Sequence, residues 1–225
     1  VPDEFTGARV PGADGNGVVQ LYHGSPGGLR PGRELSLPEP SSDRFGASLA
    51  AGDFDADGRD DLAIGVPGEG LTPGQRAMDY GDGALHVVYG TRNGLRGARS
   101  EMWTQRLLKG EPRYYDRFGA SLAAGDLDGD GDADLAVGVP GENSVQVMPG
   151  SPRGGLSRHG DVRIKKQGSV VAILPSRGKR PATLVIAAPD TGTVTYVPGS
   201  RNFRLGEPRR KASGDGLFGH ALAAR

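Results

Sequence analysis

RFGASLAAGDFDADGRDDLAIGVP, residues 44–67, decides the fold, and it returns at residues 117–140 as RFGASLAAGDLDGDGDADLAVGVP. The middle of each copy reads Asp-x-Asp-x-Asp-Gly-x-x-Asp. Carboxylates at loop positions 1, 3 and 5, with glycine at position 6, are the arrangement that wraps oxygen ligands around a calcium ion. Gly58 and Gly131 permit the sharp turn, which a Cβ would obstruct. The predicted side-chain ligands are Asp53, Asp55, Asp57 and Asp61 in the first copy and Asp126, Asp128, Asp130 and Asp134 in the second.

The surroundings of these loops differ from those of an EF-hand. An EF-hand has a bidentate glutamate at position 12 and a helix on each side, whereas position 12 here is Ile64 or Val137 and the flanks are short and rich in Gly and Val. The pattern therefore predicts a calcium loop inside a β-hairpin, with the backbone carbonyls of Arg59 and Asp132 as the ligands at position 7. A solvated acidic turn is the alternative, but its carboxylates would repel one another, and the identical spacing occurs twice. We expect two calcium ions.

The residues around the loops resemble a known repeat. Phe45-Gly46 precedes Gly65-Val66-Pro67, and Phe118-Gly119 precedes Gly138-Val139-Pro140, as in FG-GAP repeats. The acidic loop is similar to that of integrin α-subunit β-propellers and of many bacterial secreted proteins. This resemblance implies an all-β fold, namely a β-propeller of four-stranded antiparallel blades with calcium loops between strands A and B. The high content of Gly (39) and Pro (17) suits many short strands joined by tight turns.

A third, weaker copy follows at a constant offset of 49 residues from the second. Cationic and other residues replace its loop carboxylates, so we expect a blade that binds no metal; the replaced positions are Pro175, Arg177, Lys179, Pro181 and Thr183. In the first full copy the four strands are expected at 46–51, 62–66, 84–89 and near 103–108. The repeats divide the chain into a partial blade at 1–43, blades at 44–116 and 117–165, a degenerate blade at 166–216, and the first strand of a further or ring-closing blade at 217–225.

The two ends of the sequence leave the blade number open. The chain begins just after the position of a calcium loop and stops in a strand A that opens with Phe218-Gly219. The ends could together make one composite blade and close a four-bladed ring. Alternatively the chain is a piece of a larger propeller, since the resemblance to integrins implies seven blades. Because the chain opens with Val1 and shows no signal peptide, we interpret it as a processed product or an excised fragment.

Composition excludes several classes of function. The 27 basic and 27 acidic residues balance, which gives no reason to expect nucleic acid or an anionic membrane as a partner. The absence of cysteine excludes disulfides and thiol chemistry. The sequence contains no run of 18 apolar residues, so we do not expect it to insert into a membrane.

Nothing in the sequence has the pattern of a catalytic site. Gly46-Ala47-Ser48-Leu49-Ala50 superficially resembles a G-x-S-x-G nucleophile elbow, but it opens a strand, lacks the final glycine and has a duplicate at Ser121. We expect no catalytic residues and no enzyme activity. The remaining alternatives are a lectin-like sugar binder and the propeller domain of a secreted hydrolase.

Strand alternation predicts which face would bind a ligand. The A–B and C–D turns share one face, and the B–C and D–A connections share the other, which carries the long segments 68–82 and 111–117. The resemblance to integrins implies a secreted, extracellular adhesion module that binds a protein or glycan on this second face. Large amphipathic side chains are enriched at binding hot spots, so the candidate ligand-binding residues are Arg76, Tyr80, Arg113, Tyr114 and Tyr115.

Overall fold

The computed structural model describes residues 17–35, 43–70, 81–95, 100–152, 154–176, 178 and 180–213. Within these residues the regular structure consists of short strands and single turns of 3-10 helix. The strands are β1 (Val19–Ser25), β2 (Gly28–Leu35), β3 (Leu49–Gly52), β4 (Asp61–Val66), β5 (Ala84–Val88), β6 (Ser100–Trp103), β7 (Ser121–Gly125), β8 (Asp134–Val139), β9 (Ser144–Met148), β10 (Val162–Lys165), β11 (Val170–Leu174), β12 (Thr183–Ala188), β13 (Thr193–Pro198) and β14 (Arg209–Ser213). The 3-10 turns are η1 (Gln105–Leu107), η2 (Pro140–Glu142), η3 (Pro189–Thr191) and η4 (Arg201–Phe203).

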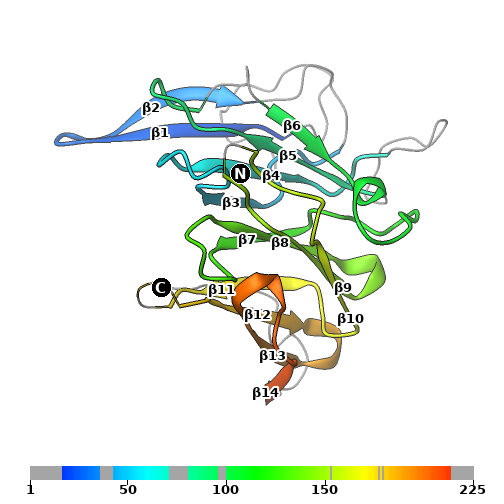
Figure 1. The fold of residues 1–225 in the computed structure, drawn as a ribbon. Helices are drawn as coiled ribbons and strands as arrows, with labels where there is room; N and C mark the ends of the chain where they lie inside the picture. The colour runs from blue at the N-terminus through cyan, green and yellow to red at the C-terminus, as the bar shows by residue number, and fades with distance from the viewer. Residues whose placement is uncertain are drawn as a thin grey trace.

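The strands form three four-stranded sheets and one hairpin. Each four-stranded sheet joins consecutive strands in antiparallel order, namely β3–β6, β7–β10 and β11–β14, and β1 pairs with β2. Figure 1 shows the sheets stacked one beside the next, from the β1–β2 hairpin at one end to β14 at the other. The first strand of one sheet contacts the first strand of the next, β3 against β7 and β7 against β11. This is the arrangement of β-propeller blades, which confirms the predicted fold class.

The third sheet repeats the backbone of the second at the predicted offset of 49 residues. Strands β11 and β12 begin 49 residues after β7 and β8, and η3 follows η2 by the same number. The residues that end these two 3-10 turns, Asn143 and Gly192, are both left-handed, with φ of 50° and 59°. Left-handed residues also precede the blades at equivalent positions, Arg117 with φ 56° and Lys166 with φ 61°. The degenerate copy therefore keeps the blade although it has lost the acidic residues.

Close contact between neighbouring blades explains the repeated Gly-x-Pro. A Cβ built on Gly65 would lie 2.1 Å from the carbonyl oxygen of Gly119, and one built on Gly138 would lie 1.8 Å from that of Ser169. The serine of the repeated Gly-Ala-Ser also crosses this interface, because the Ser48 hydroxyl donates to the Gly119 carbonyl at 2.7 Å. In the next repeat the Ser121 hydroxyl accepts from the Val171 N–H at 3.1 Å. These serines tie one blade to the next.

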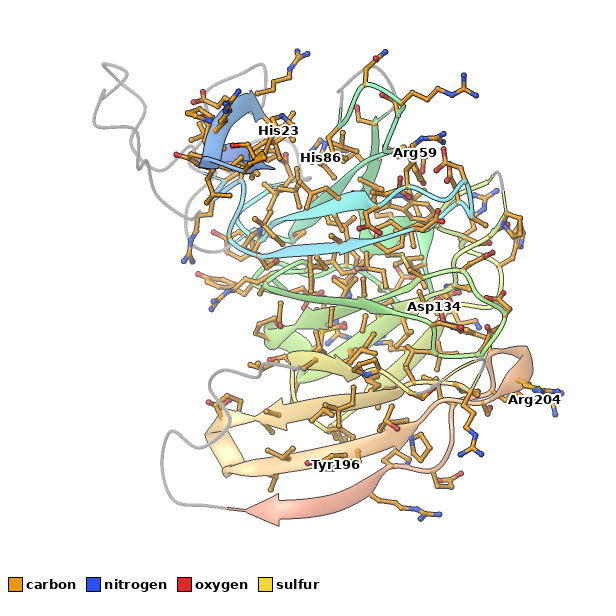
Figure 2. The ribbon with its side chains drawn as sticks, turned by 90° about the vertical axis from the view of Figure 1, so that its left-hand side faces the viewer. His23, Arg59, His86, Asp134, Tyr196 and Arg204 are labelled. Atoms are coloured by element: carbon orange, nitrogen blue, oxygen red, sulfur yellow. The ribbon has the colours of Figure 1, made fainter. Side chains whose placement is uncertain are left out.

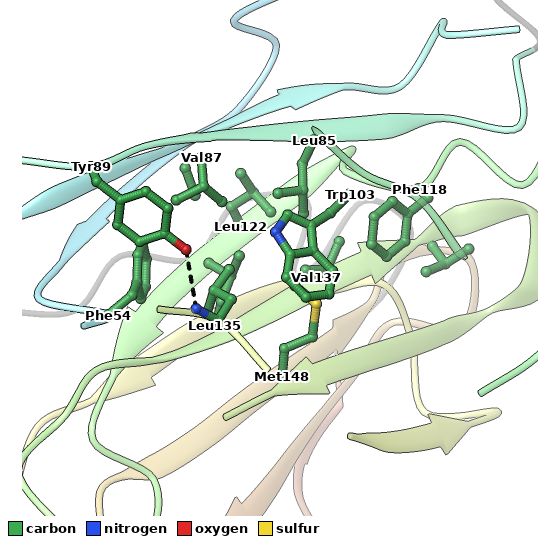
Figure 3. Close-up of a cluster of buried hydrophobic side chains, with 13 residues drawn as sticks. Phe54, Leu85, Val87, Tyr89, Trp103, Phe118, Leu122, Leu135, Val137 and Met148 are labelled. Carbon is green, nitrogen blue, oxygen red and sulfur yellow. Dashed lines mark hydrogen bonds between the residues drawn. The ribbon is translucent and has the colours of Figure 1, made fainter. Parts of the chain in front are cut away.

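Apolar side chains fill the spaces between the sheets. One cluster lies between the first two blades and includes Phe54, Trp103, Phe118 and Met148 (Figure 3). The hydroxyl of Tyr89, whose ring is buried in this cluster, accepts a hydrogen bond from the Leu156 N–H at 3.2 Å. A second cluster joins the second and third blades, and a third joins the β1–β2 hairpin to the first blade. Each blade therefore buries its faces against its neighbours, as repeat architectures require.

The fourth strand of the first blade lies earlier than predicted. We expected it near 103–108, but β6 ends at Trp103 and η1 follows. The reason is that β6 pairs with β5, which begins at Ala84, and Trp103 already pairs with Leu85. The chain then leaves the sheet, and the buried Gln105 donates to Glu142 Oε2 of the next blade at 3.1 Å.

Several predictions fall outside the described residues. The composite closing blade depends on 1–16 and 214–225, and Arg76, Tyr80, Arg177 and Lys179 are also outside. The three four-stranded sheets fall within the predicted ranges 44–116, 117–165 and 166–216, and the boundaries themselves stay predictions. Among the described residues, no helix has the length and apolar character needed to cross a membrane.

Replacing Gly138 with alanine tests the contact between blades. The added Cβ would meet the Ser169 backbone, which cannot rotate away, so we expect Gly138→Ala to lower the free energy of unfolding by roughly 2–3 kcal/mol. Gly24→Ala is the matched control, because nothing lies within 4 Å of a Cβ at that position. Urea unfolding in excess calcium measures both, and an unchanged midpoint for Gly138→Ala would contradict the packing described.

Candidate metal centre

The first acidic loop joins β3 to β4 and is shaped by its own carboxylates. Asp53 accepts hydrogen bonds from two backbone N–H groups across the turn, from Asp57 to Oδ1 at 3.0 Å and from Gly58 to Oδ2 at 2.8 Å. Asp55 Oδ1 also accepts from the Asp57 N–H, at 3.2 Å. Ala56 has φ 55° and Gly58 has φ 83°, so two of these three residues are left-handed and the turn is tight. The carboxylates thus fold the loop around a common centre.

The second loop, between β7 and β8, has the same form. Asp126 accepts from the N–H groups of Gly129 and Gly131, the latter at 3.1 Å. Asp128 Oδ1 accepts from the Asp130 N–H at 3.1 Å. The glycine at position 129 has φ 80°, the left-handed conformation that Ala56 adopts in the first loop. The repeated sequence has therefore produced a repeated loop.

Carboxylate oxygens converge in both loops. One oxygen each from Asp53, Asp55 and Asp61 lies within 4.8 Å of the others, and the same holds for Asp126, Asp128 and Asp130. Asp57 and Asp134 belong to the predicted ligands but lie outside these two groups, and their ligand roles stay predictions. Asp57 forms an ion pair with Arg59, with 2.8 Å between Oδ2 and Nη1.

The aspartate at position 9 connects each loop to the turn after strand C. Asp61 accepts from the Phe54 N–H of its own loop at 2.9 Å and from the Gly90 N–H at 2.7 Å. Asp134 accepts from the Leu127 N–H at 2.7 Å and from the Gly150 N–H at 3.0 Å. The sequence analysis missed this role, although its signal was present, since each acidic repeat is followed by a strand that ends in glycine.

Burial opposes ionisation of the aspartate at position 9 of each acidic loop. Burial raises the pKa of Asp61 to about 6, with further contributions from Asp55 and Asp53, and it outweighs the two hydrogen bonds that favour the ionised form. Burial likewise raises the pKa of Asp134 to about 8, with Asp128 and Asp130 adding to it. A divalent cation among these oxygens would reverse this effect by favouring ionised carboxylates.

The donor set fits a hard divalent cation. All of the converging side-chain atoms are carboxylate oxygens, which are the ligands that calcium and magnesium prefer, and a flexible shell from one loop suits calcium better than the stricter octahedron of magnesium. Asp53, Asp55 and Asp61 would hold the ion in the first loop, and Asp126, Asp128 and Asp130 in the second. Such an ion would supply charge neutralisation.

The equivalent region of the third blade has replaced the carboxylate link with a backbone one. Thr183 stands where Asp134 stands in the second blade, and the Gly199 N–H, equivalent to that of Gly150, donates to the Ala182 carbonyl at 2.9 Å. The turn is closed without a charge. The prediction that this blade binds no metal stays a prediction.

Three of the predicted ligand-binding residues are described, and they belong to a different type of connection from the acidic loops. Arg113, Tyr114 and Tyr115 are exposed and belong to the connection between β6 and β7, a D–A connection. The acidic loops are A–B connections, and Figure 2 shows Arg59 and Asp134, which mark the two loops, at one edge of the stack together with Arg204 of a C–D turn. The structure therefore separates the candidate metal centre from the candidate binding residues.

These features define a class of protein, a β-propeller whose blades carry acidic A–B loops. Residues 45–88 and 118–156 match the FG-GAP repeat family. These two stretches of the chain are thus FG-GAP repeats, which confirms the resemblance seen in the sequence.

Integrin α subunits and a phospholipase are similar to the chain. Integrin alpha-PS5 of Drosophila melanogaster is 35% identical over 120 residues, which cover 52% of this chain and 11% of the integrin. Integrin alpha pat-2 of Caenorhabditis briggsae is 31% identical over 157 residues, 68% of this chain and 12% of the integrin. The human phosphatidylinositol-glycan-specific phospholipase D is 33% identical over 143 residues, 60% of this chain and 16% of the enzyme. The chain therefore matches only a small part of each relative.

Proposed function

We propose that this chain is a calcium-stabilised extracellular β-propeller module that binds a protein ligand through the face opposite its acidic loops. The observation that carries the proposal is the division between two faces. Converging carboxylates occupy the A–B loops, whereas exposed aromatic side chains occupy a D–A connection. The similarity to integrin α subunits supports an adhesion role, and it is also the reason for placing the module outside the cell.

Calcium in this proposal is structural. Its ligands, Asp53, Asp55 and Asp61 in one loop and Asp126, Asp128 and Asp130 in the other, lie at the edges of blades rather than around a reactive centre. Neutralising them removes the repulsion that opposes folding of the loops. A cation that binds only the folded state stabilises it by mass action.

The binding face has a rigid aromatic feature. The rings of Tyr114 and Tyr115 meet edge to face, with centroids 4.2 Å apart, and 43% and 47% of the two residues is exposed. The turn that carries them is closed by Asp116, which accepts from the Arg113 N–H at 2.6 Å and donates its own N–H to the Arg113 carbonyl at 3.0 Å. Because the turn is already fixed, binding would cost little conformational entropy.

A groove of about 480 Å³ is lined by Tyr115. The segments around it are B–C and D–A connections of neighbouring blades, so the groove opens on the proposed binding face. Its lining includes Tyr115, Arg117, Asn143, Ser169 and Asp190. Such a mixture of an aromatic ring with charged and amide groups suits a polypeptide segment better than a lipid.

The phospholipase relatives favour a second candidate function. A propeller within a secreted hydrolase would have the same blades and acidic loops, and human phosphatidylinositol-glycan-specific phospholipase D matches 60% of this chain. In that case the face would dock onto a catalytic domain or bind a glycan. The lectin alternative is an outcome of the binding experiment below, and the hydrolase-associated domain stays a second candidate.

Calcium titration tests the metal part of the proposal. Two acidic loops, and a third that has lost its carboxylates, lead us to expect two calcium ions per chain in calorimetric titration of metal-free protein with CaCl₂. Asp126→Ala should bind one ion. Each occupied site should raise the free energy of unfolding by about 2.7 kcal/mol at a free calcium concentration 100 times its dissociation constant. A stoichiometry of zero or four would contradict the loop assignment.

Truncation of the tyrosines tests the binding face. We expect Tyr114→Ala and Tyr115→Ala each to weaken binding by roughly 1–2 kcal/mol, because exposed rings in a fixed turn bury large areas at little entropic cost. The measurement is binding of calcium-loaded protein to arrays of purified secreted and matrix proteins and to a glycan array.

Tyr22→Ala is the control for this experiment, since Tyr22 is 57% exposed and belongs to the β1–β2 hairpin. Binding that survives loss of both loop tyrosines, but is lost with Asp53→Ala in protein shown to be folded, would place the ligand on the face of the acidic loops. Binding to glycans alone would favour the lectin.

A further inference from the structure

The second blade holds the start of the first acidic loop. The Ala133 N–H donates to the Asp53 carbonyl at 2.9 Å, and the Ser151 N–H donates to the Phe54 carbonyl at 3.0 Å. The blades pack closely here, because a Cβ on Gly52 would lie 2.7 Å from the Cβ of Ala133. Residues at positions 7 and 8 of the second loop are thus neighbours of the first. Figure 2 shows the two loops following one another along the same edge.

Asp132, at position 7 of the second loop, is buried at this junction. Only 7% of the residue is exposed, and its Oδ2 has no hydrogen-bond partner among the described residues. A buried carboxylate oxygen without a partner is costly, and such groups in proteins are normally hydrogen-bonded, paired or bound to a metal.

Carboxylates of both acidic loops contribute to the electrostatic environment of Asp132. Burial is the main reason why its pKa is raised, and Asp130, Asp53, Asp126 and Asp55 contribute in that order. The hydrogen bond from the Ala133 N–H to the Asp53 carbonyl places the neighbouring Asp132 beside position 1 of the first loop. The Asp53 carboxylate in turn converges with those of Asp55 and Asp61.

We propose that Asp132 lends its side chain across the blade interface as an additional carboxylate ligand of the divalent cation held by Asp53, Asp55 and Asp61. The inference rests on the proposed function, because it needs a cation in the first loop. The backbone carbonyl of Asp132 remains free to serve position 7 of its own loop. One residue then connects two cation sites that belong to different blades.

The second site has no such donor. The contact between blades is repeated there, since the Ala182 N–H donates to the Asp126 carbonyl at 2.7 Å as the Ala133 N–H donates to that of Asp53. The residue equivalent to Asp132, 49 positions later, is Pro181. The first site therefore receives a carboxylate from the following blade and the second does not, so the first site should bind calcium more tightly.

Calorimetric titration with CaCl₂ tests this, in a background where Asp126→Ala has removed the second site. We expect Asp132→Asn to weaken the remaining site by about tenfold, the lower end of the effect of removing a group that supports a metal site. The substitution keeps the shape of the side chain and the backbone carbonyl. Asp60→Asn is the matched control, because it removes the same charge at an exposed position in the first loop and should change affinity by less than about threefold.

The outcomes separate this inference from the proposed function. One site of unchanged affinity in Asp132→Asn, or equal weakening by Asp60→Asn, would overturn the role of Asp132 and leave calcium binding intact. No calcium binding in the background variant would overturn both. Near-ultraviolet circular dichroism verifies folding of each variant. As an independent arm, Pro181→Asp in a chain whose first site is removed by Asp53→Ala should tighten the second site, and an unchanged affinity there would count against the inference.

Discussion

The structure depends on a buried carboxylate in each acidic loop, in a position where burial opposes its ionisation. The aspartate at position 9 of each acidic loop, Asp61 or Asp134, uses its two oxygens to join its own loop to the turn that follows strand C. These oxygens accept hydrogen bonds from backbone N–H groups, which favours the charged form, yet the pKa values lie at about 6 and about 8 because burial dominates. A divalent cation bound in the acidic loops would favour the ionised forms of these carboxylates. The same carboxylates would therefore respond to metal binding and hold the blade together.

The third blade shows how the fold persists without that charge. Its turn is closed by a hydrogen bond from the Gly199 N–H to the Ala182 carbonyl, so no carboxylate needs to be buried. The strands, the 3-10 turn and the left-handed residues keep their places at the offset of 49 residues. What the blades share is therefore the backbone path and the close contact at their interfaces, and the acidic loop is an addition that two of them carry.

The sequence predicted the features that repeat locally. The spacing of the aspartates predicted the two loops, and the copy of the repeat 49 residues later predicted the third blade. Both can be recognised in the sequence without knowledge of the contacts between blades. The predicted end of the fourth strand was wrong, because β6 stops where its partner β5 begins. The burial of Asp132 could not be predicted either, because it depends on the contact with the neighbouring blade. Position 7 is Arg59 in the first loop, where it pairs with Asp57, whereas Asp132 at the same position of the second loop is buried. Contacts between blades decide these cases.

Residue-resolved amide hydrogen exchange by nuclear magnetic resonance tests the central claim most directly. The amides of Gly90 and Gly150 donate to the position-9 carboxylates, whereas that of Gly199 donates to a backbone carbonyl. If a cation maintains the carboxylate links, chelation of calcium should accelerate exchange at Gly90 and Gly150 while Gly199 keeps its protection. Unchanged protection of Gly90 and Gly150 after chelation would contradict the account.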